Sequence, residues 1–199
     1  MSPAKARALG ALGLLAVGVF ALLVASRGDA PPELPRYREV PAWTFLERSG
    51  RPWGAADLKG SVWVADYFFT SCHGPCPLMT ARMRLLQDRF AAAPRFRLVS
   101  FTVDPEHDTP EVLRAYADRH GAHPERWLFL TGPREEVNRL AFQGMGVGSA
   151  GESLHHSTRL VLVDGDGVIR GYYDAKDDAH VARLERDLGA LLRLPAPSP

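Results

Sequence analysis

The sequence has little of three features that narrow the function of a chain of 199 residues. It has only two cysteines, Cys72 and Cys76. A chain of this length can bury a sufficient core without disulfide bridges, so the pair is not expected to be a structural staple. There is no excess of one charge, because 24 Lys and Arg are set against 23 Asp and Glu, and no overall attraction to nucleic acid follows. A glycine-rich phosphate loop and a Gly-x-Ser-x-Gly elbow are also missing.

One long apolar run is present near the N-terminus. The segment 9–25 contains no charged or strongly polar side chain, Lys5 and Arg7 precede it, and Arg27 follows it. This length favours an uncleaved transmembrane anchor, with a cleaved signal peptide as the alternative. The basic residues before it predict an N-terminus held inside and an exported remainder.

The remainder of the chain divides by composition into a linker, one domain and a tail. We expect a cytoplasmic tail at 1–8, the anchor at 9–25, a proline-rich linker at 26–36, a thioredoxin-like domain at 37–195 and a disordered tail at 196–199. Export matters for the cysteines, because an oxidising compartment lets two neighbouring thiols form a disulfide.

Within the domain, apolar runs predict strands that alternate with helices. The expected strands are two short pieces around a turn at Ser49 and Gly50, then 61–69, 96–103, 126–132 and a hairpin over 159–174. The expected helices cover 78–90, a segment from Thr109 to about Gly121, 134–146 and 180–194. This order predicts a mixed sheet flanked by helices. Two thiols at the end of the first buried strand, opening the first helix, are the thioredoxin-like arrangement.

The cysteine pair stands in the stretch TSCHGPCP and has three possible roles: a disulfide switch, a metal site or a pair of inert core residues. If the helix begins near Cys72, both thiols share one helix face, and the helix N-terminus lowers the thiol pKa. Two thiolates joined by an imidazole suit copper better than zinc.

Two histidines are candidates for that imidazole. His155 and His156 directly precede the hairpin, in a loop that lies beside the dithiol in thioredoxin-like folds. Thioredoxins carry a proline at this point, whereas SLHHSTRLVLV has none. Geometry alone does not choose between the two histidines, and His73, between the cysteines, is a further candidate for an accessory ligand. Met79, Met83 and Met145 are expected to be core residues.

These residues resemble the Sco/SenC family of thioredoxin-like copper chaperones. The resemblance covers about 45–194 and rests on the Cys-x₃-Cys motif, its approach GRPWGAADLKGSVWVADYFFTSC, SFTVDPEHDTPEVLRAYADRHG, RWLFLTG and HHSTRLVLVDGDG. It implies one copper ion, Cu(I) or Cu(II), bound by Cys72, Cys76 and His156. It implies that Asp104 and Asp108 order the loop near the metal and are not ligands. His73 and the extra His155 depart from the family pattern.

The resemblance also implies a function. The chain is expected to be a metallochaperone, with a redox-active dithiol, that delivers copper to the dinuclear copper site of cytochrome c oxidase. The alternatives are a thiol-disulfide oxidoreductase that reduces the cysteines of that site or of other exported proteins, and a copper or redox sensor. The implied partners are the copper-receiving oxidase subunit, a thiol reductant of the exported compartment and the membrane. The implied location is a bacterial-type inner membrane, with the domain on the periplasmic side.

Overall fold

The computed structural model describes residues 33–148, 154 and 157–196. The unit Leu34–Pro199 is compact and contains all the helices and strands reported below. Its strands are β1 (Thr44–Glu47), β2 (Pro52–Gly54), β3 (Val62–Phe68), β4 (Phe96–Thr102), β5 (Trp127–Thr131), β6 (Arg159–Val163) and β7 (Ile169–Asp174). Its helices are η1 (Ala55–Leu58), α2 (Cys76–Arg89), α3 (Pro110–Arg119), α4 (Arg134–Arg139), the π-helix η2 (Leu140–Gly144) and α5 (Asp178–Arg193).

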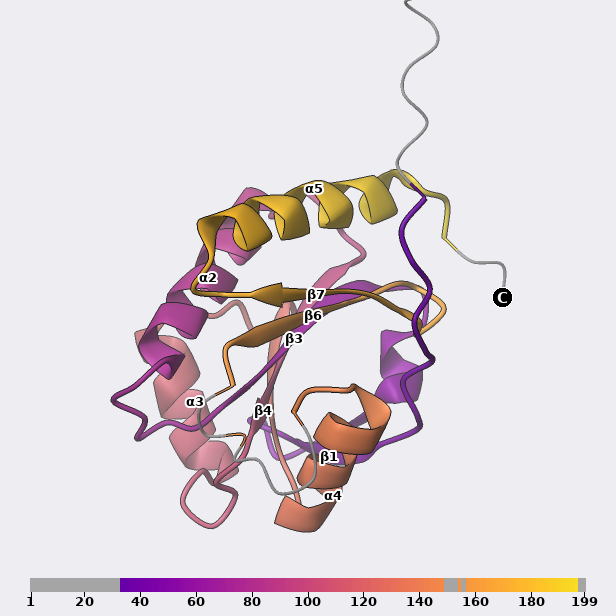
Figure 1. Cartoon of the computed structure of the whole chain (residues 1–199). Helices are drawn as coiled ribbons and strands as arrows, with labels where there is room; N and C mark the ends of the chain where they lie inside the picture. The colour runs from indigo at the N-terminus through magenta and orange to yellow at the C-terminus, as the bar shows by residue number, and fades with distance from the viewer. Residues whose placement is uncertain (1–32, 149–153, 155–156, 197–199) are drawn as a thin grey trace, which may run out of the picture. The chain divides into compact units, whose positions relative to one another are not determined.

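The strands form one mixed sheet in the order β2-β1-β5-β4-β3-β6-β7 (Figure 1). The three central strands β3, β4 and β5 run parallel to one another. The outer pairings, β1 with β2 and β5, and β6 with β3 and β7, are antiparallel. Parallel strands need crossover connections, and α2 and α3 supply them, which explains why helices follow β3 and β4.

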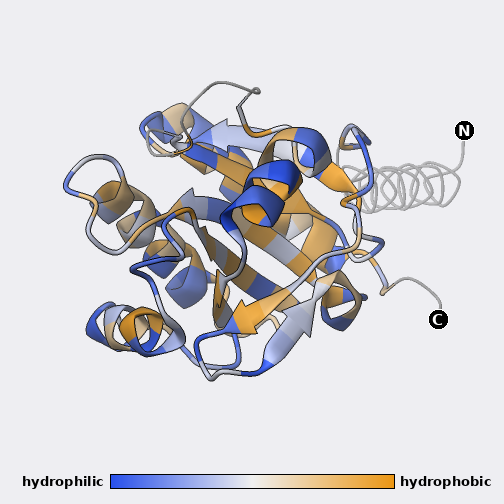
Figure 2. Cartoon of the chain, turned by 90° about the horizontal axis from the view of Figure 1, so that it is seen from below, coloured by the Kyte–Doolittle hydropathy of each residue, from blue (hydrophilic) through white to orange (hydrophobic). Residues whose placement is uncertain are grey.

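Each face of the sheet is covered by its own apolar core. In β3 all seven residues are buried, because alternate side chains enter opposite cores. Val62, Val64 and Phe68 pack into the core beneath α2, α3 and α5, whereas Trp63 and Tyr67 pack into the core beneath α4 and η2. Figure 1 shows these two groups of helices on opposite sides of the sheet, and Figure 2 shows apolar strands between helices with polar outer faces.

The predicted mixed α/β, thioredoxin-like sheet with flanking helices is confirmed. The helix expected from Thr109 begins at Pro110, and the Thr109 hydroxyl accepts a hydrogen bond from the backbone N–H of Val112 at 3.4 Å. The turn between β1 and β2 contains Gly50 at φ 79°, a left-handed conformation that favours glycine.

The predicted anchor at 9–25 lies outside the described residues. Among the residues that the structure does describe, no helix is long and apolar enough to cross a membrane.

The segment before β1 is hydrogen-bonded to the edge strand β7. The backbone N–H of Tyr37 donates to the carbonyl of Ile169 at 3.0 Å, and the Arg170 guanidinium donates to the carbonyls of Leu34 and Pro35. Asp164 holds Arg170 in place at 2.8 Å. Leu34 and Pro35, which make two of these contacts, belong to the segment predicted as a linker.

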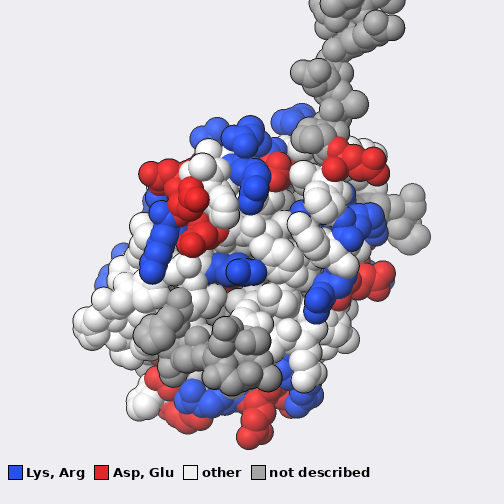
Figure 3. Space-filling view, viewed as in Figure 1, with Lys and Arg blue, Asp and Glu red and all other residues white. Residues whose placement is uncertain are grey.

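Charged side chains of both signs are interspersed on the described face seen in Figure 3. This mixed surface agrees with the formal net charge of +1. No general electrostatic attraction to a polyanion follows from it, so function has to be sought in local sites.

Candidate metal centre at the dithiol

The two cysteines lie where β3 ends and α2 begins, at the carboxyl edge of the parallel strands. Both are free thiols. Cys76 is the first residue of α2, with Pro75 as its N-cap, and Cys72 lies four positions earlier, in the loop. The helix expected over 78–90 thus begins at Cys76, and the condition that it begins near Cys72 is not met. Proline disfavours helical conformation in the residue before it, and Pro75 follows Gly74 directly, so the helix starts after this pair.

The two thiols have different environments. Cys72 is partly exposed, whereas Cys76 is 2% exposed and packs into the core beneath α2. The pKa of Cys76 is raised to about 12, chiefly by burial. A hydrogen bond with Cys72 also raises this pKa, and its effect is larger than the lowering by the hydrogen bond with the backbone of Phe69. The lowering expected from the helix N-terminus is therefore not found at Cys76, whose pKa is raised chiefly by burial.

Asp108 ties the loop that carries Cys72 to the end of β4. Its side chain is fully buried and accepts hydrogen bonds from the backbone N–H of Thr70 at 3.1 Å, from the Thr70 hydroxyl and from the Thr102 hydroxyl. Thr70 stands two residues before Cys72, so these bonds fix the approach to the first thiol. A buried carboxylate with several donors is a strong local constraint.

Asp104 lies on the same loop as Asp108, between β4 and α3, and belongs to a more exposed network. Its carboxylate contacts His107 Nδ1 at 2.8 Å and Arg134 Nη2 at 3.1 Å. Partial burial raises the pKa of Asp104, but the hydrogen bonds from His107 and Arg134 outweigh this and lower it overall. Arg134 also pairs with Glu106. Asp104 therefore links the loop to α4, whereas Asp108 links it to the approach to Cys72.

A further acidic residue, Asp66, lies in the middle of β3 and was not identified from the sequence. It is 1% exposed, and within the described part of the chain neither carboxylate oxygen has a hydrogen-bond partner. Burial raises the pKa of Asp66 to about 7, and the nearby hydroxyl of Ser100 on β4 offsets part of this rise. Strand alternation places Asp66 on the face of Val64 and Phe68, which is the face covered by α2. Its negative charge is among the groups that raise the pKa of Cys76.

A tyrosine and a threonine complete the buried polar groups near the dithiol. The Tyr116 hydroxyl on α3 lies 2.7 Å from the Thr80 hydroxyl on α2. Burial raises the pKa of Tyr116 to about 12, and the charges of Asp66 and both cysteines act in the same direction. The phenol therefore stays protonated at neutral pH, and its hydrogen bond with Thr80 joins the two helices.

Of the three candidate histidine ligands, only His73 lies within the described residues. His73 is described and exposed, in the loop between the two cysteines. His155 and His156 lie outside the described residues. The residues that the structure describes contain no cluster of three or more Cys, His, Asp and Glu suited to a metal ion. The pair Cys72 and Cys76 is therefore the part of the predicted ligand set that the structure brings together.

The strand that follows the two histidines begins beside the dithiol loop. β6 pairs antiparallel with β3, and Val161 lies opposite Ala65. Continuing this register places the first residue of β6, Arg159, next to the end of β3 that leads to Cys72. The carbonyl of Thr158, directly before β6, accepts a hydrogen bond from the backbone N–H of Ala175 at 2.8 Å. The described chain thus approaches the carboxyl edge of β3 shortly after position 156.

The methionines are core residues, as the sequence analysis expected. Met79, Met83 and Met145 are each fully buried. Met79 and Met83 pack beneath α2, and Met145 lies in the opposite core, where its sulfur accepts a hydrogen bond from the Tyr67 hydroxyl at 3.2 Å.

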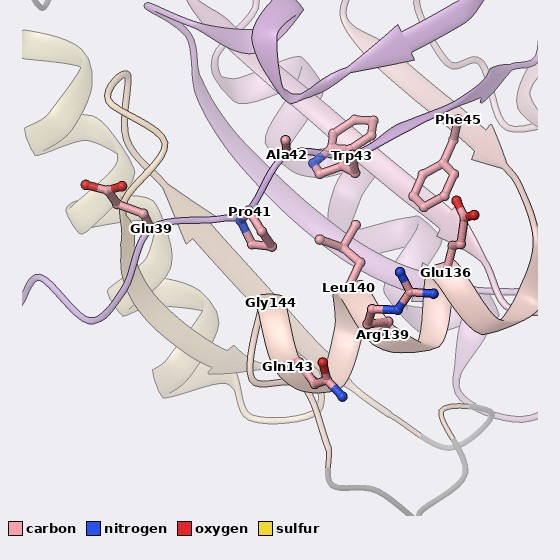
Figure 4. A pocket seen from close by; sticks show the side chains of 10 residues that line it. All are labelled: Glu39, Pro41, Ala42, Trp43, Phe45, Glu136, Arg139, Leu140, Gln143 and Gly144. Carbon is pink, nitrogen blue, oxygen red and sulfur yellow. The ribbon is translucent and has the colours of Figure 1, made fainter.

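A separate cavity of about 390 Å³ lies between the segment Glu39–Phe45 and the α4–η2 helix (Figure 4). Trp43 and Phe45 form one side and Leu140 the other. No cysteine or histidine lines it, so this cavity offers no soft metal ligands and is not part of the dithiol site.

The SCO1/SenC family profile matches residues 32–189. The chain belongs to this family. The SCO1 protein homolog of Bacillus subtilis is 34% identical over 172 residues, which cover 83% of this chain and 89% of that protein. Both cysteines and the loop of Asp104 and Asp108 lie within the matched segment.

Solved structures of the Sco family share this fold. A SCO1/SenC family lipoprotein from Bacillus anthracis superposes with a TM-score of 0.71 at 30% identity, over 81% of this chain and 99% of that one. BsSco, described as a member of the Sco family of cytochrome c oxidase assembly proteins with a disulfide switch, gives 0.70 at 31% identity, over 82% and 98%. Yeast Sco1 with copper bound, at 21% identity and a TM-score of 0.60, shares the fold.

Proposed function

We propose that this chain is a copper-binding metallochaperone of cytochrome c oxidase assembly, with a dithiol that can also be oxidised. The observation that carries the proposal is a pair of free thiols, Cys72 and Cys76, at the carboxyl edge of β3 in a Sco/SenC domain. Thiolates are soft ligands that favour copper over magnesium or calcium. Copper-bound yeast Sco1, which shares this fold, supports copper as the cargo.

His156 is the proposed third ligand. The family pattern selects it, because Asp166 and Gly167 set the count back from the hairpin turn. The pairing of β6 with β3 supports a ligand from this part of the chain, since Thr158 and Arg159 approach the edge of the sheet that carries Cys72. His73 and His155 are proposed as accessory positions only. Asp108 is proposed to order the loop through Thr70, without touching the metal.

The two thiols are proposed to act in sequence during loading. Cys72 is the accessible one and would meet the incoming ion first. Cys76 is buried and protonated at neutral pH, because its pKa is raised to about 12. It has to lose its proton to become a ligand, so copper binding releases protons and is favoured by rising pH. A disulfide between the two removes both ligands, so oxidation releases copper and bound copper protects the thiols.

Thiol-disulfide exchange is the second candidate function. The specific observation in its favour is the unequal pair, with one accessible thiol and one buried thiol. In exchange reactions the accessible thiol attacks and the second resolves the mixed disulfide. The disulfide switch named for BsSco, 31% identical, points the same way.

The cellular setting is also a proposal. The apolar run 9–25 would anchor the chain in a bacterial-type inner membrane, with the domain on the periplasmic side. The partners there would be the oxidase subunit that receives copper and a thiol reductant that keeps Cys72 and Cys76 reduced.

A copper titration of the full reduced chain tests the proposal. We expect one Cu(I) per chain in competition with a chromogenic chelator, and loss of tight binding in Cys72→Ser and in Cys76→Ser. His156→Ala should weaken binding by about tenfold or more, whereas the matched control His155→Ala should bind normally. Absence of tight binding by the reduced chain would exclude copper as cargo.

A cellular test separates the two candidate functions. If the chain transfers copper, His156→Ala prevents oxidase assembly while the reduction potential of the dithiol stays unchanged. Normal oxidase assembly in His156→Ala cells would contradict the transfer of copper and leave the exchange reaction as the function.

A further inference from the structure

A second cavity, of about 520 Å³, lies at the end of the sheet opposite the dithiol. Arg97 stands at the start of β4 and Leu128 at the start of β5, and both line the cavity. Because β3, β4 and β5 are parallel, these positions are at the amino edge, whereas Cys72 follows the carboxyl edge of β3. The cavity is therefore independent of the proposed copper site.

Arginines from separate elements meet at this cavity. They are Arg48 after β1, Arg51 before β2, Arg97 on β4 and Arg114 on α3. We call this cavity, lined by these four residues, the arginine pocket. Among the described residues, Arg48 alone of the four forms an ion pair with a carboxylate, that of Glu47.

Arg48 is buried in a way that is unusual for a guanidinium group. It is 5% exposed, and its Nη1 atom has no hydrogen-bond partner in the described part of the chain. Its Nη2 donates to the carbonyl of Ala122 at 3.3 Å, and the group lies 5.5 Å from the ring centre of Phe129. Burial lowers the pKa of Arg48, against the opposing effect of Glu47. A buried cation with a free donor is costly unless an anion compensates it.

The acidic side chains around the pocket compensate only part of this charge. They are Glu47, Asp118 and Glu125, against the four arginines. Glu47 is 5% exposed and partly committed elsewhere, since its Oε2 accepts the N–H of Ser49 at 2.7 Å and its Oε1 lies 3.4 Å from Arg48 Nε. The lining therefore has an excess of one positive charge at neutral pH.

Two further arginines are held at the pocket by backbone contacts instead of by acids. Arg114 Nη2 donates to the carbonyl of Arg48 at 3.0 Å, and Arg97 Nη1 donates to the carbonyls of Pro94 and Phe96. Burial and the like charge of Arg126 lower the pKa of Arg97. These bonds position the guanidinium groups, and the charge of Glu125 offsets only part of the lowering at Arg97.

We propose that the arginine pocket binds a phosphate group, either free or as the headgroup of an anionic phospholipid. A guanidinium fork matches the oxygens of phosphate. The arginines reach the pocket from β-strand, loop and helix, so their donors arrive from several directions. A tetrahedral oxyanion presents acceptors in several directions, whereas a planar carboxylate presents them in one plane.

The test measures binding of two soluble probes to the full chain by calorimetry, at low ionic strength. The probes are inorganic phosphate and dihexanoyl phosphatidylglycerol below its micellar concentration. Binding of the first identifies free phosphate as the ligand source, and binding of the second alone identifies a lipid headgroup. Both results support the proposal, and added sodium chloride should weaken the interaction by screening.

Arg97→Gln and Arg114→Gln should each weaken binding by about tenfold, because each removes a charge-assisted hydrogen bond. Arg119→Gln is the matched control: it lies on α3 like Arg114 but does not line the pocket, and its affinity should equal that of the unchanged chain. Arg48→Gln is avoided, because Arg48 also packs on Phe129 and can affect folding. Binding of neither probe, or equal weakening in Arg119→Gln, would overturn the proposal.

Discussion

The loop around Asp108 and the strand around Asp66 both bury a carboxylate near the dithiol, but they satisfy it differently. Asp108 accepts bonds from the Thr70 N–H and from the hydroxyls of Thr70 and Thr102. Asp66 has no hydrogen-bond partner within the described residues, and its pKa is raised to about 7. The comparison teaches that burial alone does not define the role of an acid. Several hydrogen-bond donors make Asp108 a structural constraint, whereas at Asp66 burial outweighs the nearby Ser100 hydroxyl and makes the carboxyl group responsive to pH.

Removing the satisfied carboxylate should have the largest effect on stability. Asp108→Ala leaves the buried donors of Thr70 and Thr102 without an acceptor. We expect the free energy of unfolding to fall by about 3–5 kcal/mol, measured by urea denaturation. The control Asp88→Ala removes a surface pair with Arg84 and should cost less than about 1 kcal/mol. A similarly small loss in Asp108→Ala would contradict the structural role.

Neutralising the unsatisfied carboxylate should have the opposite sign. The pKa of Asp66 is about 7 in the folded chain against 3.8 as a reference. The folded state therefore holds a proton that the unfolded state has lost, and Asp66 reduces stability as the pH rises from about 4 to 7. Asp66→Asn should be more stable by about 2 kcal/mol at pH 8, with about 4 kcal/mol as the limit set by about 1.4 kcal/mol per pKa unit.

The control for Asp66 is the pH series itself. The advantage of Asp66→Asn over the unchanged chain should shrink as the pH falls toward 4, where the carboxyl group is protonated in the folded state. The measurement is urea denaturation at each pH. A stability difference that does not change with pH would show that packing, and not ionisation, distinguishes the two side chains.

The smallest expected effect concerns Cys76. The charge of Asp66 contributes to its raised pKa, after burial and Cys72. In a Cys72→Ser background, Asp66→Asn should therefore accelerate alkylation of Cys76 by iodoacetamide several-fold at pH 9, read by mass spectrometry. Asp88→Asn should leave the rate unchanged. An equal rate in both variants would mean that the charge of Asp66 does not reach the thiol.

The fold could be predicted because the composition of its central strands is typical of buried strands. The runs 61–69 and 96–103 are apolar and rich in β-branched and aromatic residues, as strands buried on both faces must be. The start of α3 could also be predicted, because Thr109 caps the helix and Pro110 suits its first position. Both features depend on neighbours in sequence.

The beginning of α2 and the pKa of Cys76 could not be predicted in the same way. Helix spacing places Cys72 and Cys76 on one helix face, but the helix begins only at Cys76, directly after Pro75. The sequence predicted a lowered thiol pKa from the helix N-terminus, whereas the pKa of Cys76 is raised by burial. The size of this rise depends on how deeply the core beneath α2 covers Cys76, which no local pattern reveals.

The sequence by itself determined which residues can do chemistry here: two thiols at a strand-to-helix junction, acids in the following loop and histidines before the hairpin. The tertiary structure alone decided how each behaves. It brought Asp108 to Thr70, buried Asp66 under α2 beside the Ser100 hydroxyl, and gathered four arginines at the opposite edge of the sheet. The physical reason is that pKa and ion pairing depend on desolvation and on charges within a few ångströms, and these are set by segments far apart in the chain.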